Sequence, residues 1–167
     1  MRKNLFILSA SLLFLSCSQV NGQPEPIKAF ENLIGGKWIS QGKQLGGFNG
    51  KTEIQFEWGL NGKIVKATTY ATDPKTMEFG LRNEGIRAYS AADKVVQFYE
   101  FDKLGGITKG EVLVDGTDLH YNYEYQGMML RDSWIFVDND QYTLIVGVWQ
   151  EDKWSQKFHE QVFRRNK

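Results

Sequence analysis

Apolar and polar side chains alternate with a period of two residues along most of this chain. From residue 37 onward, short segments rich in Val, Ile, Thr, Tyr, Phe and Trp are separated by turn residues every 8–14 positions or so, which is typical of an all-β sandwich or barrel. Strands joined by short turns pair as antiparallel neighbours, and closing the sheet removes its exposed edges. The pattern therefore predicts an all-β fold, a ten-stranded antiparallel up-and-down barrel with a short N-terminal helix. The predicted strands span 37–42, 51–59, 63–72, 80–90, 94–102, 107–114, 118–126, 130–137, 141–150 and 154–164.

The predicted helix lies directly before the first strand. Ile27, Phe30, Leu33 and Ile34 recur at helical spacing, and the glycine pair at 35–36 ends the run. Because the apolar residues share one side, we expect this helix to cover one end of the barrel.

Alternation also indicates which side chains point into the barrel. In the segment 118–126, three tyrosines and a leucine share one face, and polar residues occupy the other. We expect an interior that combines aromatic rings with a few polar groups. The predicted inward faces are Ile54, Phe56 and Trp58 in the second strand, Leu119, Tyr121, Tyr123 and Tyr125 in the seventh, and Trp154, Gln156, Phe158, Glu160, Val162 and Arg164 in the last.

An aromatic interior is either a solid core or the wall of a pocket. Side chains can just fill a barrel of about eight strands, and ten strands enclose more space. The strand number therefore favours a pocket for a small hydrophobic or amphipathic molecule. A filled barrel that acts as an interaction module in the cell envelope is the alternative. The candidate ligand-binding residues are Trp58, Tyr70, Tyr121, Tyr123, Tyr125, Phe158 and Glu160.

The first residues have the layout of a secretory signal. A basic start is followed by an uncharged apolar run from Leu5 to Leu15 and then by Cys17, and the run is too short to span a bilayer. A single Cys at this place resembles a bacterial lipoprotein signal, in which the Cys is lipidated. We predict a signal peptide at 1–16, a lipidated Cys17 with a flexible tether at 17–26, and a β-barrel domain at 27–167. The predicted location is the bacterial cell envelope, with the protein anchored in a membrane and facing the periplasm. An ordinary signal peptide cut after Gly22 would instead give a secreted or periplasmic soluble protein.

Composition excludes several other classes of function. Cleavage before Cys17 would leave 18 of the 20 basic residues beside 20 acidic ones, which argues against a nucleic-acid partner. Cys17 is the only Cys, so no disulfide framework is expected. The two histidines have no Cys partner, so no metal site is predicted. The sequence predicts no particular oligomeric state.

A family resemblance supports the barrel. The short helix, Gly36-Lys37-Trp38 at the first strand, the meander of about ten strands and the closing Phe163-Arg164-Arg165 resemble the calycin superfamily. Residues 27–165 are most similar to the bacterial lipocalin-like domains of unknown function related to nitrobindin, the haem-binding β-barrels. The resemblance implies that Trp38 and either Arg164 or Arg165 stack at the closed end as structural residues, in a cation–π contact of about 0.5–2 kcal/mol.

Haem is the cofactor that the resemblance raises. Nitrobindin-like barrels ligate haem iron through one His close to the C-terminus, where this chain has His159. Alternation places His159 opposite Phe158 and Val162, and His120 opposite Leu119, so we expect both imidazoles to point outward. An outward imidazole cannot reach an interior iron. Haem is therefore disfavoured, and no cofactor is predicted.

Interior carboxylates distinguish two classes of function. Glu84 and Glu160 share faces with apolar residues and are expected to point inward. A buried carboxylate must pair with a cation, accept hydrogen bonds or stay protonated. Pairing with Arg82, Arg87 or Arg131 would fit a protein that only binds its ligand. An unpaired carboxylate beside a Tyr would instead fit an enzyme, either an isomerase or a hydrolase.

Overall fold

The computed structural model describes residues 25–166, so the predicted signal peptide, Cys17 and most of the predicted tether lie outside the described residues. A short helix, α1 (Glu25–Lys28), and a 3₁₀ turn, η1 (Glu31–Leu33), precede the sheet. The described residues then form ten strands whose bounds are close to the predicted ones. They are β1 (Lys37–Lys43), β2 (Asn49–Gly59), β3 (Ile64–Thr72), β4 (Phe79–Ser90), β5 (Val95–Asp102), β6 (Ile107–Asp115), β7 (Asp118–Tyr125), β8 (Met128–Asp138), β9 (Gln141–Gln150) and β10 (Lys153–Asn166).

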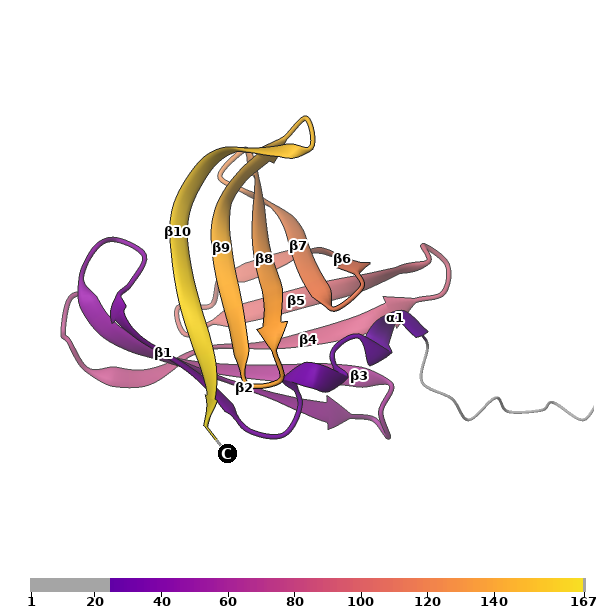
Figure 1. The fold of residues 1–167 in the computed structure, drawn as a ribbon, viewed down its shortest axis with the longest axis horizontal. Helices are drawn as coiled ribbons and strands as arrows, with labels where there is room; N and C mark the ends of the chain where they lie inside the picture. The colour runs from indigo at the N-terminus through magenta and orange to yellow at the C-terminus, as the bar shows by residue number, and fades with distance from the viewer. Residues whose placement is uncertain (1–24, 167) are drawn as a thin grey trace, which may run out of the picture.

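Hydrogen bonding joins these strands into one closed antiparallel barrel. Each strand lies beside its neighbours in the sequence, and β1 lies between β2 and β10. The predicted fold class is therefore confirmed. In Figure 1, β8, β9 and β10 run steeply across the direction of β3, β4 and β5. This strong twist lets a single sheet wrap around one interior.

The seam between β1 and β10 is closed at one end only. Beyond Ile39, β1 pairs with β2 as far as Lys43 but has no register partner in β10 among the described residues. Figure 1 shows the two strands separating from this point. The seam is thus joined at the end that holds the helix and open toward the other end. Its paired positions are Lys37 with Asn166, Trp38 with Arg165 and Ile39 with Arg164.

The end of the barrel that holds the helix is plugged by apolar side chains, and we call it the closed end. Ile27, Phe30, Leu33 and Trp38 are all fully buried. The indole Nε1 of Trp38 donates to the carbonyl oxygen of Leu33 at 2.8 Å, and the Tyr142 ring packs edge-on against the indole with centroids 5.2 Å apart. The helical spacing therefore predicted the role of this segment correctly.

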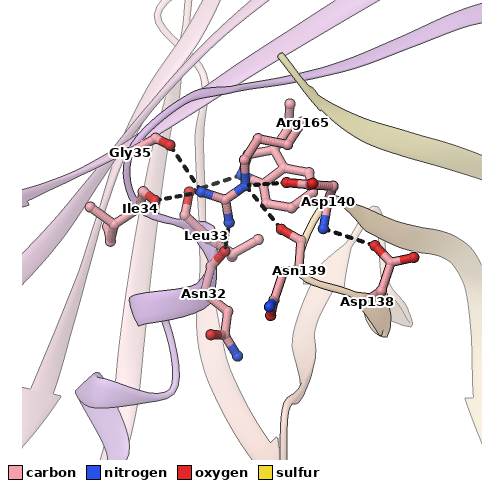
Figure 2. Close-up of polar contacts among 9 residues, drawn as sticks. Asn32, Leu33, Ile34, Gly35, Asp138, Asn139, Asp140 and Arg165 are labelled. Atoms are coloured by element: carbon pink, nitrogen blue, oxygen red, sulfur yellow. Dashed lines mark hydrogen bonds and ion pairs between the residues drawn. The ribbon is translucent and has the colours of Figure 1, made fainter. Parts of the chain in front are cut away.

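Arg165 joins several segments of the closed end (Figure 2). Its guanidinium carbon lies 4.6 Å from the centroid of the Trp38 ring, which is a cation–π contact. Of the two arginines proposed to stack on the Trp, Arg165 makes the contact, whereas Arg164 is exposed. The guanidinium also donates to four backbone carbonyl oxygens, those of Asn32, Ile34, Gly35 and Asn139.

From His159 onward, the last strand turns the opposite face inward from the predicted one. Two β-bulges interrupt the pairing of β10 with β9, one on each side of Lys157, and each bulge adds a residue to one strand only. Phe163 is buried, whereas Val162 is exposed, and Glu160 and Arg164 are exposed as well. The prediction that Glu160, Val162 and Arg164 face the interior is therefore wrong.

Candidate functional site

The barrel encloses a cavity of about 690 Å³. Side chains from β2 through β10 line it, together with residues of the loops at 44–48 and 73–78, which lie at its opening. We call the rim of this opening the mouth, and it consists of the loops at 44–48 and 73–78 and the turn at 126–127. Phe98, Trp134 and Phe163 are buried aromatic residues of the lining. The barrel is therefore solid at the closed end and hollow toward the mouth.

Four of the predicted ligand-binding residues lie at the cavity wall: Tyr121, Tyr123, Tyr125 and Phe158. Tyr121 is buried, Tyr123 is partly buried, and Tyr125 and Phe158 are exposed. The alternation in the seventh strand thus predicts its inward face correctly.

The other three predicted residues are outside the cavity lining. Trp58 packs against the buried core instead. Tyr70 is exposed and stacks on Phe79 with ring centroids 6.2 Å apart. Glu160 is exposed and its carboxylate lies 3.2 Å from the Nζ of Lys157. Their predicted placement at the pocket is therefore wrong.

The most buried charge at the cavity is Arg87 of β4, which the sequence analysis names only as a candidate partner for a carboxylate. Its Nη2 forms an ion pair with Oε1 of Glu100, and its Nε donates to the hydroxyl oxygen of Tyr121 at 3.2 Å. The side-chain amide of Asn83 donates to the other Glu100 oxygen at 2.5 Å. Gly85 faces Glu100 across the strands and leaves room for its carboxylate, because a Cβ at Gly85 would overlap it. These contacts form one interior polar cluster.

Aromatic rings surround the Arg87 guanidinium. Its central carbon lies 5.3 Å from the centroid of the Tyr121 ring and 5.8 Å from that of Phe56. Burial lowers the pKa of Arg87, but the oxygens of Tyr121 and Glu100 raise it above its ordinary value, so the side chain stays charged. The third nitrogen, Nη1, is buried and has no hydrogen-bond partner among the described residues. Such a buried ion pair is weak evidence for stability, so we consider a role in function.

Asp132 of β8 is a second interior carboxylate. It lines the cavity, lies opposite Tyr121 in the register, and accepts the O–H of Tyr123 at 2.9 Å. Desolvation raises the pKa of Asp132 to about 7, against the effect of the Tyr123 hydrogen bond, and the negative charge of Glu100 adds to the rise. Asp132 is only partly exposed and lines the cavity. Asp132 can therefore gain or lose a proton near neutral pH.

The carboxylates that line the cavity are not the ones predicted to face inward. Glu84 and Glu160, which it expected inside, are both exposed. A signal for Asp132 is present in the sequence, because Leu130, Asp132 and Trp134 occupy alternate positions of one strand. A single carboxylate on an otherwise apolar face is the pattern that would have identified this residue.

His159 lines the cavity, in contrast to the outward position predicted for it. Its Nε2 lies 3.0 Å from Oε1 of Gln161, which is another lining residue. His120, in contrast, is outside the lining, and its Nδ1 lies 2.8 Å from the Ser133 hydroxyl. The argument against haem from an outward imidazole thus fails at His159, because an inward imidazole is the type of ligand that haem iron takes.

Two further features bear on partners and cofactors. Residues 25–166 contain no group of three or more His, Cys, Asp and Glu side chains suited to hold a metal ion. The same residues contain no helix with the length and apolar character needed to cross a bilayer.

Fold and site together define a class of protein, a closed ten-stranded antiparallel barrel whose interior holds an open-ended cavity and a buried polar cluster. No protein-family model matches this chain, and no curated protein matches it. The cavity is therefore the observation on which a function can be proposed.

Proposed function

We propose that this chain is an exported, lipid-anchored barrel of the calycin type that binds a small hydrophobic or amphipathic molecule. The observation that carries the proposal is the cavity, which has aromatic walls and a few buried polar groups. Small-molecule sites are typically concave, largely apolar and about 300–1,000 Å³ in volume, and the cavity of about 690 Å³ lies in this range. A barrel filled by side chains would have no such space, so the cavity favours ligand binding over the interaction module.

A ligand panel tests the proposal. Fatty acids, quinones and haem are titrated into the barrel, and both the intrinsic Trp fluorescence and the melting temperature are followed. Trp134 lines the cavity, so a bound molecule should change its emission, and binding to the folded state alone should raise the melting temperature with occupancy. Trp134→Phe should lose most of the fluorescence change and keep the thermal shift. If saturating amounts of all three classes leave both signals unchanged, the proposal fails for these three classes of ligand.

A matched pair of valines locates the bound molecule. Val146 lines the cavity, whereas Val162 is exposed on the outside of β10. Val146→Trp should reduce the affinity for any ligand of the panel at least tenfold, because the indole occupies the space that the ligand needs. Val162→Trp adds the same group outside and should leave the affinity unchanged. Equal effects of the two substitutions would place the ligand elsewhere.

The haem arm of the panel needs its own control. Haem was disfavoured because both histidines were predicted to point outward, and this reason does not hold for His159. If haem binds through iron ligation, His159→Leu should abolish the Soret shift and leave binding of fatty acids or quinones intact.

The lipid anchor is tested separately. A diacylated Cys17 would hold the protein in a membrane through two acyl chains. Cys17→Ala should then move the protein from the membrane fraction to the soluble fraction of its host. Wild-type protein that is fully soluble, with Gln23 as its first residue, would contradict the anchor and favour the ordinary signal peptide.

The second candidate function is an enzyme, and the contact between Asp132 and Tyr123 is the observation that favours it. A carboxyl group with a pKa of about 7 beside a Tyr hydroxyl, 2.9 Å away, is suited to general acid–base catalysis. The test is to recover each bound ligand after incubation and compare its mass and isomeric form with the starting compound. Conversion by the wild type that is lost in Asp132→Asn, with binding retained, would support the enzyme.

A further inference from the structure

We propose that the cavity selects ligands with a cationic head group, such as a long-chain or aromatic primary amine, and that Asp132 is the counter-ion. This inference rests on the proposed ligand-binding function and specifies the class of ligand.

The charge balance of the interior cluster is the first argument. Both oxygens of Glu100 are occupied, one by Arg87 and the other by Asn83. Asp132 receives one hydrogen bond, from Tyr123, and forms no ion pair with any described residue. This part of the cavity lining, with Glu100, Asp132 and Arg87, therefore holds two carboxyl groups and one buried cation. An ammonium group beside Asp132 would complete the pairing of charges, and buried charges are rarely left unpaired.

The alternative, an anionic head group bound by Arg87, fits less well. Two of the guanidinium nitrogens already have partners, and the third, Nη1, is buried. A ligand oxygen could reach Nη1 only if the side chain moved out from between Phe56 and Tyr121. An added carboxylate would also lie in the field of Glu100 and Asp132, and like charges repel strongly where water is excluded.

The rings beside Asp132 suit a cation as well. Tyr121 lies directly opposite Asp132 in the register. Phe98 packs edge-on against both Tyr121 and Tyr123, with centroids 5.1 and 6.0 Å apart. Aromatic faces attract ammonium groups, and the attraction grows when water is excluded. The Tyr121 ring already holds the Arg87 guanidinium, so the aromatic lining is compatible with a cationic head group, and the carboxylate of Asp132 is the group that selects it.

Binding of a cation should depend on pH in a defined direction. Desolvation raises the pKa of Asp132 to about 7, and a bound cation would stabilise its ionised form. Affinity for an amine should therefore rise about tenfold from pH 6 to pH 8, as the ionised fraction rises from about one tenth to about nine tenths. The other titratable or charged groups that line the cavity are Arg82, Arg87, Glu100, Asp102, Tyr121, Tyr123, Tyr125 and His159. His159→Gln should leave this pH profile unchanged if Asp132 causes it.

The test compares dodecylamine, dodecanol and dodecanoate, which share one tail, below their aggregation concentrations at pH 8. We expect dodecylamine to bind at least tenfold more tightly than dodecanoate, with dodecanol between them. Asp132→Asn should remove the preference for the amine, and Glu160→Gln, which removes an exposed carboxylate, should keep it. A second measurement needs only the wild type: calorimetry at pH 7 in buffers of different ionisation enthalpy should show release of about half a proton per bound amine and none for dodecanol.

Three results would overturn the inference and leave the proposed function standing: equal binding of the three compounds, tightest binding of dodecanoate, or an amine preference that survives Asp132→Asn. Amine binding without proton release would also overturn it, even if the Asn variant failed to fold. If none of the three dodecyl compounds binds, and fatty acids and quinones also leave the fluorescence and the melting temperature unchanged, the proposed function itself fails.

Discussion

The closed end and the mouth half of the barrel are built from the same strands but differ in how their charged side chains are paired. At the closed end, the Trp38 indole has a carbonyl acceptor, and Arg165 donates to four others. Toward the mouth, the Arg87 Nη1 has no partner among the described residues, and Asp132 has no cation. The apolar side chains differ too, since those of the closed end are fully buried, whereas Leu45 and Met77 at the mouth are exposed.

This difference separates stability from function. A buried polar group without a partner destabilises the folded state, and one that is fully paired does not. An arrangement that leaves a buried guanidinium nitrogen without a hydrogen bond and a cavity carboxyl without an ion pair is therefore expected where a ligand completes the bonding. The closed end should determine how stable the barrel is, and the cavity should determine what it binds.

Trp38→Ala is the largest predicted effect and tests the closed end directly. Removing a fully buried indole should lower the free energy of unfolding by about 3–5 kcal/mol, because the transfer and cavity terms add. Denaturant titration measures the loss. Ligand affinity of the folded variant should stay close to that of the wild type. Tyr125→Ala is the control at the mouth, and we expect it to change stability by about 0.5 kcal/mol or less, because the ring is exposed. A stable Trp38→Ala variant that no longer binds ligand would reverse the division between the two ends.

The pH dependence of stability should show how much Asp132, which has no ion pair among the described residues, destabilises the folded state. The unfolded chain loses this proton near the ordinary pKa of 3.8, whereas the folded chain keeps it until about pH 7. Between these values the folded state binds more protons, so stability should fall as pH rises and then level off above pH 7. At about 1.4 kcal/mol for each pH unit, the loss is on the order of 4 kcal/mol.

Asp132→Asn should remove this decline and make the protein more stable at pH 8, as measured by denaturant titration from pH 4 to pH 8. Asp73→Asn is the matched control. Hydrogen bonds from Lys103 and from the backbone N–H groups of Lys75 and Thr76 lower the pKa of Asp73 to about 2, so its substitution should leave the slope between pH 4 and pH 7 unchanged. A wild-type stability that is flat across this window would mean that Asp132 is not desolvated.

Arg165→Lys gives the next largest effect. A lysine keeps the charge but loses the planar fork that donates to several carbonyl oxygens at once, so we expect a loss of about 2–3 kcal/mol, from hydrogen bonds to a charged group. Arg164→Lys is the control, because Arg164 is exposed, and its effect should stay within about 0.5 kcal/mol. Thermal denaturation of the two variants side by side measures the difference, and equal losses would contradict the role given to Arg165.

Glu160→Gln is the smallest predicted effect and checks the corrected face of β10. The carboxylate is exposed and pairs with Lys157 on the surface. Surface ion pairs contribute about 0–1 kcal/mol, so stability should hardly change, and ligand affinity should not change at all. A clear loss of affinity would indicate that Glu160 lies at the cavity, on the face that the alternation predicted.

Much of the architecture could be predicted from the sequence. Alternation located the ten strands, the helical spacing of Ile27, Phe30 and Leu33 predicted the plug, and the tyrosines of β7 lie on the predicted face. These features depend on local periodicity and on turns between neighbouring strands, and both can be read along the chain.

The polar interior could not be predicted in the same way. The usual rule assigns apolar residues to the inside, but a cavity reverses it locally, so that Ile86 is exposed while Arg87 is buried beside it. The bulges in β10 removed the simple alternation where His159 lies. Tyr70 is amphipathic and can occupy the inner or the outer face of the strand, so its residue type does not indicate that it points outward.

The sequence by itself determined the strand order and the closed end, because short turns enforce antiparallel neighbours and an apolar helix side must be covered. The site depends on the tertiary structure, because its polar residues come from four strands. They are Asn83 and Arg87 on β4, Glu100 on β5, Tyr121 and Tyr123 on β7, and Asp132 on β8. Which of them share partners depends on the register and curvature of the closed barrel, and neither quantity is encoded in the period of a single strand.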